Sequence, residues 1–143
     1  MTTSGNLSEQ DLKHLELLQS VITRLSNNSF LVKGWCITLN SVLVAVASGS
    51  ASRSAHWRSV LVAVTVAIGF WLLDGYYLRQ ERLFRALYEG IVTRRGDPPA
   101  LLTMDTRRYD GDVSWLGVLL SRPMLFCYGV LATADSLLIL FLR

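Results

Sequence analysis

Hydrophobic and polar positions divide the chain into three long apolar runs separated by polar segments. The runs cover residues 31–48, 60–77 and 123–142, and each holds about 18 to 20 residues with almost no charge. A helix of roughly 20 residues spans the ~30 Å hydrocarbon core of a bilayer. The pattern therefore predicts an all-α membrane protein with three transmembrane helices and polar segments at residues 1–30, 49–59 and 78–122.

The first polar segment, residues 1–30, is expected to form a cytoplasmic amphipathic helix. Ser8 and Asp11 have the spacing of a capping box, so the helix should begin at Ser8. Asn27-Asn28-Ser29 is a run of poor helix formers and predicts a kink or break before the first span. One apolar stripe at 3-4-3 spacing would pack on the chain itself or on a second copy: Leu15, Leu18, Ile22 and Leu25.

The other two polar segments are predicted to differ in structure. Residues 49–59 are small and polar, which favours an irregular external loop. The second span should continue as a cytoplasmic helix over residues 78–93, steadied by the i,i+4 pair Glu81–Arg85 and ended by the Gly96-Asp97-Pro98-Pro99 run. Residues 113–120 are too short to span and suit the membrane interface, before Pro123 opens the third span.

Composition narrows the class of protein further. The chain has 143 residues, the length of a single domain, and 51% of them are hydrophobic. Its mean hydropathy is +0.36. These values disfavour a soluble domain, a secreted disulfide scaffold and a disordered chain. Residues 1–30 carry several charges and no apolar run near their start, so we expect no cleaved signal peptide.

Lysine and arginine predict the orientation. With the N-terminus in the cytoplasm, eleven of the 14 lysine and arginine residues lie on the cytoplasmic side, and only Arg53, Arg58 and Arg143 lie outside. Cytoplasmic flanks of membrane spans carry such an excess. We therefore expect a membrane protein, surrounded by lipid, with its N-terminus in the cytoplasm and its C-terminus outside.

Polar residues within the spans are candidates for function. Asp135 and Asn40 both fall near the bilayer midplane, counted along their helices at ~1.5 Å per residue. An ionised carboxylate there costs at least ~2.5–3.5 kcal/mol unless it faces protein or water. The first span also has a face of small residues at 4-3-4-3 spacing, suited to helix packing or, in an oligomer, to a narrow aqueous path: Gly34, Thr38, Ser41, Ala45 and Ser48.

Residue patterns of soluble enzymes are missing from the sequence. There is no phosphate-binding glycine loop and no metal-ligand motif, and the predicted topology places His14 and His56 on opposite sides of the membrane. We expect no enzyme, no metal and no cofactor. Arg79, Arg82 and Arg85 recur every third residue and could contact phosphates, but the cytoplasmic segments are close to neutral, which does not indicate general nucleic-acid binding.

Two stretches of the chain resemble a group of small bacterial membrane proteins. They run from His14 to Arg24 and on to Lys33-Gly34-Trp35, and from Leu73-Asp74 to Leu87-Tyr88. The group is similar to effectors of anti-phage defence, with the transmembrane effector of Hailong-type systems as the nearest. The resemblance implies a homo-oligomeric channel of the bacterial inner membrane. It would depolarise the host during infection and be held shut by an oligonucleotide from a partner nucleotidyltransferase. It also implies a cytoplasmic gate or ligand site at Asn28, Lys33, Trp35, Asp74, Tyr77, Glu81, Arg82 and Arg85.

Together, these features predict a channel-type effector that is gated from the cytoplasm. Its polar layer at the midplane would comprise Thr38, Asn40, Ser41 and Asp135, and Arg79 would join the residues of the gate. Two alternatives stay open. One is a non-conducting membrane subunit that binds a cytoplasmic partner, and the other is a small proton-linked carrier that uses Asp135.

Overall fold

The computed structural model describes residues 9–49, 53–93 and 103–141, and every regular element within them is helical. This confirms the all-α fold class. The elements are α1 (Glu9–Ser48), α2 (Arg53–Thr93), the 3-10 helix η1 (Arg107–Tyr109), α3 (Trp115–Leu119) and α4 (Arg122–Phe141).

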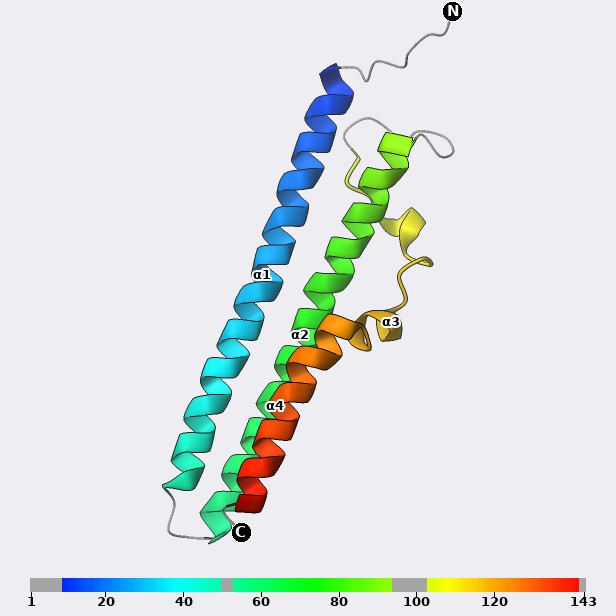
Figure 1. Ribbon diagram of the computed structural model, residues 1–143. Coiled ribbons are helices and arrows are strands. Elements are labelled where there is room, and N and C mark those ends of the chain that lie inside the picture. The colour runs from blue at the N-terminus through cyan, green and yellow to red at the C-terminus, as the bar shows by residue number, and fades with distance from the viewer. Residues whose placement is uncertain (1–8, 50–52, 94–102, 142–143) are drawn as a thin grey trace, which may run out of the picture.

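The two long helices form an antiparallel hairpin, and the shorter elements pack on one side of it (Figure 1). α1 has 40 residues and α2 has 41. Each is therefore about 60 Å long, about twice the thickness of a bilayer core. α4 runs along the first half of α2 and ends near the start of α2, whereas η1 and α3 lie beside the second half of α2 (Figure 1). One half of the molecule thus has three helices, and the other half has the hairpin alone with η1 and α3 at its side.

The apolar surface of the hairpin is mostly exposed. α1 and α2 each contain a stretch that is long and apolar enough to cross a membrane, and only 22% of the stretch in α1 and 17% of that in α2 is buried within the chain. The core helix of a soluble protein would instead be mostly buried. These helices therefore fit a membrane environment. α4 is a third apolar helix of 20 residues, and its first residue is the Arg122 that precedes the predicted span.

Two predictions about helix ends are wrong. The break expected at residues 27–29 does not occur, because α1 runs through it without interruption. Propensity costs of a few tenths of a kcal/mol are readily overridden by tertiary contacts, and Ser29 makes such a contact with Asp74. The external loop expected over residues 49–59 is shorter, since α2 already begins at Arg53. The predicted cap at Ser8 and the predicted terminator at residues 96–99 lie outside the described residues.

Most of the buried apolar side chains among the described residues fall into two groups. In the two-helix half, Leu15 and Leu18 of α1 are buried, as are Leu83 and Leu87 of α2. Half of the predicted α1 stripe thus lies in the core, and Ile22 and Leu25 are half-buried. At the joint between the two halves, the buried residues of α3 and the start of α4 are Val118, Leu119 and Met124. Gly75 of α2 allows this close approach, because a Cβ atom there would collide with Leu119 and touch Met124.

Candidate functional site

A buried ion pair joins α1 to α2 near the start of the first predicted span and the end of the second. Lys33 Nζ lies 2.8 Å from Oδ1 and 2.7 Å from Oδ2 of Asp74, whose side chain is fully buried. The Ser29 hydroxyl donates to Asp74 Oδ1, and Lys33 Nζ donates to Ser29 Oγ over 2.8 Å. The Lys33–Asp74 pair therefore lies in the interior of the molecule.

The third helix of this half also reaches Asp74. The Tyr128 hydroxyl of α4 is buried and lies close to Asp74, but it forms no well-aligned hydrogen bond with it. Cys36, one turn beyond Lys33, is fully buried and lies within electrostatic reach of both Asp74 and Asp135. α1, α2 and α4 therefore all contribute polar groups to one interior region.

A second polar contact lies deeper in the same three-helix half. Asn40 Nδ2 donates to Asp135 Oδ1 over 2.8 Å and to Oδ2 over 3.1 Å, which joins α1 to α4. Asn40 is only 4% exposed, and Asp135 is half-buried. The two residues predicted to share a depth are thus in direct contact. Asp135 has a partner within its own chain and does not require a second copy for its hydrogen bonds from Asn40.

These contacts define what we call the interior polar cluster, made of Ser29, Lys33, Asn40, Asp74, Tyr128 and Asp135. Sequence reasoning did not assign Ser29 or Tyr128 to a site. The sequence does indicate that the α1 residues of the cluster share one helix face. Ser29, Lys33 and Asn40 recur, together with Cys36, at 4-3-4 spacing. Their partners on α2 and α4 follow from the pairing of the helices, which the spacing does not contain.

The other two residues of the predicted midplane layer lie on the opposite face of α1. Thr38 and Ser41 are exposed, and their hydroxyls donate to backbone carbonyls of their own helix, those of Gly34 and Ile37. A Cβ atom on Gly34 would meet nothing within 4 Å. We call Gly34, Thr38, Ser41 and Ala45 the small polar face. The structure therefore divides the predicted layer into an interior pair, Asn40 and Asp135, and an exposed pair, Thr38 and Ser41.

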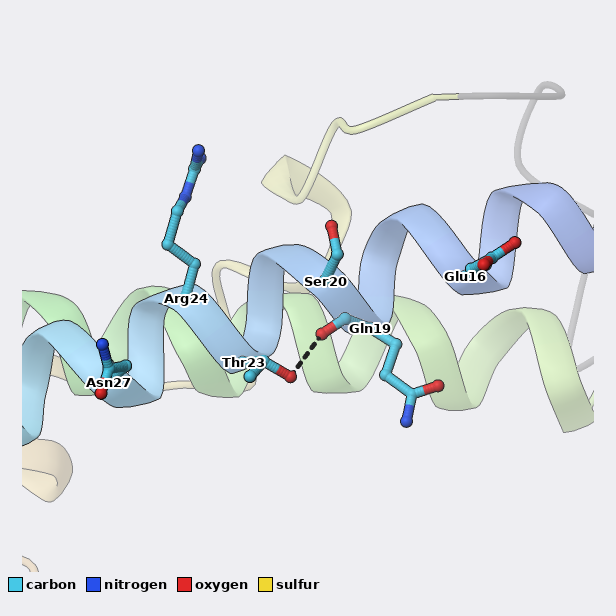
Figure 2. Close-up of a pocket in the computed structure, with 6 residues that line it drawn as sticks. All are labelled: Glu16, Gln19, Ser20, Thr23, Arg24 and Asn27. Carbon is cyan, nitrogen blue, oxygen red and sulfur yellow. Dashed lines mark hydrogen bonds between the residues drawn. The ribbon is translucent and has the colours of Figure 1, made fainter.

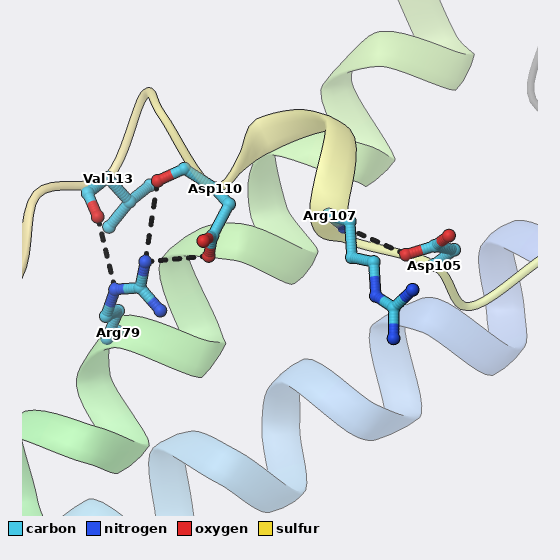
Figure 3. A network of polar contacts seen from close by, with 5 residues as sticks. All are labelled: Arg79, Asp105, Arg107, Asp110 and Val113. Atoms are coloured by element: carbon cyan, nitrogen blue, oxygen red, sulfur yellow. Dashed lines mark hydrogen bonds and ion pairs between the residues drawn. The ribbon is translucent and has the colours of Figure 1, made fainter.

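Arg79 holds the segment before α3 against α2, and Figure 3 shows its side chain reaching that segment. Arg79 Nη2 lies 2.7 Å from Asp110 Oδ1, and Nε donates to the Val113 carbonyl over 3.2 Å. The guanidinium also lies 5.9 Å from the centre of the Trp115 ring, a cation–π distance. Nearby, the Arg107 backbone N–H donates to Asp105 (Figure 3). Arg79 is thus committed to contacts within the chain.

The remaining residues of the predicted gate differ in their burial and in their partners. Arg85 donates to Glu81 Oε1 from Nε and Nη2, over 2.9 and 2.6 Å, which confirms this predicted i,i+4 pair; Glu81 is buried. Arg82 is half-buried and has no hydrogen bond or ion pair with the described residues. Trp35 is 61% exposed, whereas Asn28 and Tyr77 are half-buried, with the Tyr77 ring edge-to-face against Tyr76.

A shallow depression lies on the first half of α1, on residues that sequence reasoning did not single out as a site (Figure 2). Its volume is about 540 Å³. It has one positive and one negative side chain, so bulk charge does not favour an anionic ligand. The lining residues are Glu16, Gln19, Ser20, Thr23, Arg24 and Asn27.

The described part of the chain contains no group of three or more His, Cys, Asp and Glu side chains that could hold a metal ion. His14 is buried, and its Nε2 lies 3.0 Å from the Thr103 carbonyl oxygen, which ties the start of α1 to the segment after α2. The side chain of His56 lies outside the described residues. No protein family, curated protein or solved structure matches this chain.

Proposed function

We propose that this protein is a channel-type membrane effector in which several copies assemble and conduct ions. In this proposal α1, α2 and α4 cross the bacterial inner membrane, with the N-terminus in the cytoplasm and the C-terminus outside. The 78–122 segment then lies on the cytoplasmic side. The resemblance stated above supplies the context, which is depolarisation of the host during anti-phage defence.

The observation that carries this proposal is the exposure of the small polar face of α1. Its residues have no helix of the same chain against them, although α1 uses its other side to pack on α2 and α4. Around it, the exposed surface of α1 is apolar, with Leu31, Ile37 and Val42 each at least 45% exposed. A narrow polar strip on an otherwise lipid-like surface is suited to face other copies across a shared axis.

The continuity of α1 supports control from the cytoplasm. One uninterrupted helix carries both the depression near Thr23 and the small polar face that begins at Gly34. A tilt imposed at the cytoplasmic end would therefore move the membrane part as well. The Lys33–Asp74 pair lies between these two regions and ties α1 to α2. We assign it the role of holding the resting arrangement of the two helices.

A regulatory oligonucleotide, implied by the resemblance, would need positive groups that are not already paired. Arg79 and Arg85 have acidic partners in the chain, whereas Arg82 has none among the described residues. Arg82→Ala combined with Arg85→Ala should weaken binding of a short oligonucleotide or alter gating. Unchanged binding and gating would remove this surface from the proposal.

Ion flux from liposomes that contain the purified protein tests the channel directly. Ser41→Leu should reduce the flux, because it adds bulk and removes a hydroxyl on the small polar face. Val46→Leu is the matched control, an exposed substitution on the apolar flank of the same helix that should leave the flux unchanged. Absence of ion flux from liposomes that contain the wild-type protein would contradict the channel. Equal flux in the two variants excludes this face as the pore lining.

One observation favours a second candidate, a non-conducting subunit that binds a cytoplasmic partner. The Thr38 and Ser41 hydroxyls are satisfied by their own helix, so the small polar face needs no water. The face would then serve helix packing, and the depression on α1 would receive the partner. Growth arrest on expression of the chain without other components favours the channel, and normal growth together with absent flux favours the subunit.

A further inference from the structure

Two members of the interior polar cluster have a buried polar atom without a well-aligned hydrogen bond. Asn40 uses its amide nitrogen for both hydrogen bonds to Asp135, and its Oδ1 is buried and unpaired. The Tyr128 hydroxyl is also buried, and although it lies close to Asp74 it has no well-aligned hydrogen bond. Buried polar atoms in proteins nearly always bond to protein or to ordered water, and leaving one unsatisfied costs roughly 1–3 kcal/mol.

These two atoms belong to opposite ends of the same stretch of the interior. Lys33 and Asn40 are seven residues apart on α1, and so are Tyr128 and Asp135 on α4, which corresponds to about 10 Å in each helix. Cys36 lies within this stretch and interacts electrostatically with the carboxylates at both ends, and with Cys127 of α4. About three hydrogen-bonded waters would bridge the 10 Å from one end to the other.

We propose that the interior polar cluster binds water and that this water gives each chain its own proton route from the cytoplasmic boundary to Asp135. A proton enters from cytoplasmic water beside Lys33, which is the most exposed member of the ion pair. At each step one O–H bond forms on the accepting oxygen as one breaks on the donor, and the proton ends on the Asp135 carboxylate. Lys33, Asp74, Cys36, Cys127, Tyr128 and Asp135 are the titratable groups along this stretch.

This route lies inside one chain and is separate from any pore between copies. It rests on the proposed membrane location but not on assembly or conduction. Beyond Asn40, toward the end of α1, the interior is less polar. Leu43 and Val44 of α1 follow there, and Ala63 of α2 is buried. The cluster is therefore a hydrated recess that opens to the cytoplasm and ends at Asp135.

The native Cys36 thiol can report water in this recess. In Cys127→Ala protein embedded in liposomes, transfer to D2O should convert the infrared S–H band of Cys36 to S–D within minutes. Tyr128→Phe should slow this exchange by at least about tenfold, since without the water the thiol exchanges only when the helices separate. Tyr76→Phe is the matched control, because Tyr76 is 50% exposed and lies outside the cluster.

Each result supports or overturns the proposal that the interior polar cluster binds water. An S–H band that persists for hours shows a dry interior and overturns the proposal, as does exchange that is equally fast in Tyr128→Phe and in Tyr76→Phe. The proton route has a second readout, the carboxyl band that Asp135→Asn removes. After acidification this band should grow more slowly in Tyr128→Phe than in Tyr76→Phe, and equal rates overturn the route. Neither readout depends on ion flux, so failure of the channel is recognised separately.

Discussion

At the scale of single residues, the Lys33–Asp74 pair is a buried charge contact between α1 and α2. Asp74 is fully buried, and the Lys33 side chain is only 23% exposed. Transfer of a charge from water to such a place costs several kcal/mol, which the opposite charge and the Ser29 hydroxyl offset. The contact therefore stabilises one arrangement of the helices only as long as both charges are present.

Removal of the lysine charge alone should destabilise the protein strongly. Lys33→Met leaves the Asp74 carboxylate buried without its cation, and we expect the free energy of unfolding to fall by about 3–5 kcal/mol. Thermal unfolding in detergent, followed by circular dichroism, measures the change. Lys13→Met is the control, because Lys13 pairs with Glu9 at the surface and should contribute less than about 0.5 kcal/mol. Similar losses in the two variants would contradict the role of the buried pair.

The Asn40–Asp135 contact should depend on the amide of Asn40. Asn40→Ala removes both hydrogen bonds to Asp135, and we expect a loss of about 1–3 kcal/mol in the free energy of unfolding. Asp135→Asn keeps a group that can accept from Asn40 and should lose less, while still inserting in the membrane. The same unfolding measurement compares them. A larger loss in Asp135→Asn than in Asn40→Ala would argue against this hydrogen bond.

At the scale of elements, the continuity of α1 separates what the sequence predicts from what it does not. Apolar runs and their periodicity predict the long helices, and α4 covers nearly all of the third apolar run. These features can be read from the sequence because hydrophobic patterning and helix geometry depend on residues close together in the chain. The break predicted at residues 27–29 does not occur, since the low helix propensity of this stretch is outweighed by the contact of Ser29 with Asp74. The same limit applies to the site. The 4-3-4 row on α1 can be found in the sequence, but its partners Asp74, Tyr128 and Asp135 depend on how the helices pair.

The joint between α2, α3 and α4 should be sensitive to bulk at Gly75. Gly75→Val places carbon atoms where Leu119 and Met124 now pack, and overpacking of this kind costs about 1–3 kcal/mol beyond the loss of helix propensity. Gly69→Val is the matched control in the same helix, because nothing lies within 4 Å of its Cβ position. We expect a lower unfolding temperature only for Gly75→Val. Equal unfolding temperatures would show that α3 and α4 do not pack on α2 as described.

The segment before α3 should be loosened by loss of Arg79. Arg79→Ala removes the bonds to Asp110 and Val113 and the contact with Trp115. Backbone amides of residues 109–113 should then exchange with deuterium faster, since fewer contacts oppose local opening. Arg82→Ala serves as the control, because Arg82 makes no hydrogen bond or ion pair with the described residues. Unaltered exchange in Arg79→Ala would mean that other contacts hold the segment.

At the scale of the whole molecule, a single chain leaves much of its apolar surface uncovered. Large side chains such as Phe30, Phe126 and Leu137 are each at least 67% exposed. In the proposed membrane location lipid would cover much of this apolar surface, but lipid does not explain why a small polar face lies among it on α1. In the proposed assembly, that face points toward other copies, while the interior polar cluster remains inside each chain.

The number of copies in the membrane particle tests this account most directly, because three helices cannot enclose a pore. The measurement is the mass of the protein in lipid nanodiscs or mild detergent, corrected for bound lipid, against 16.0 kDa for one chain. We expect a particle with several copies, which Ser41→Leu disrupts more than Val46→Leu. A particle of one chain at concentrations where the protein is active would contradict the channel.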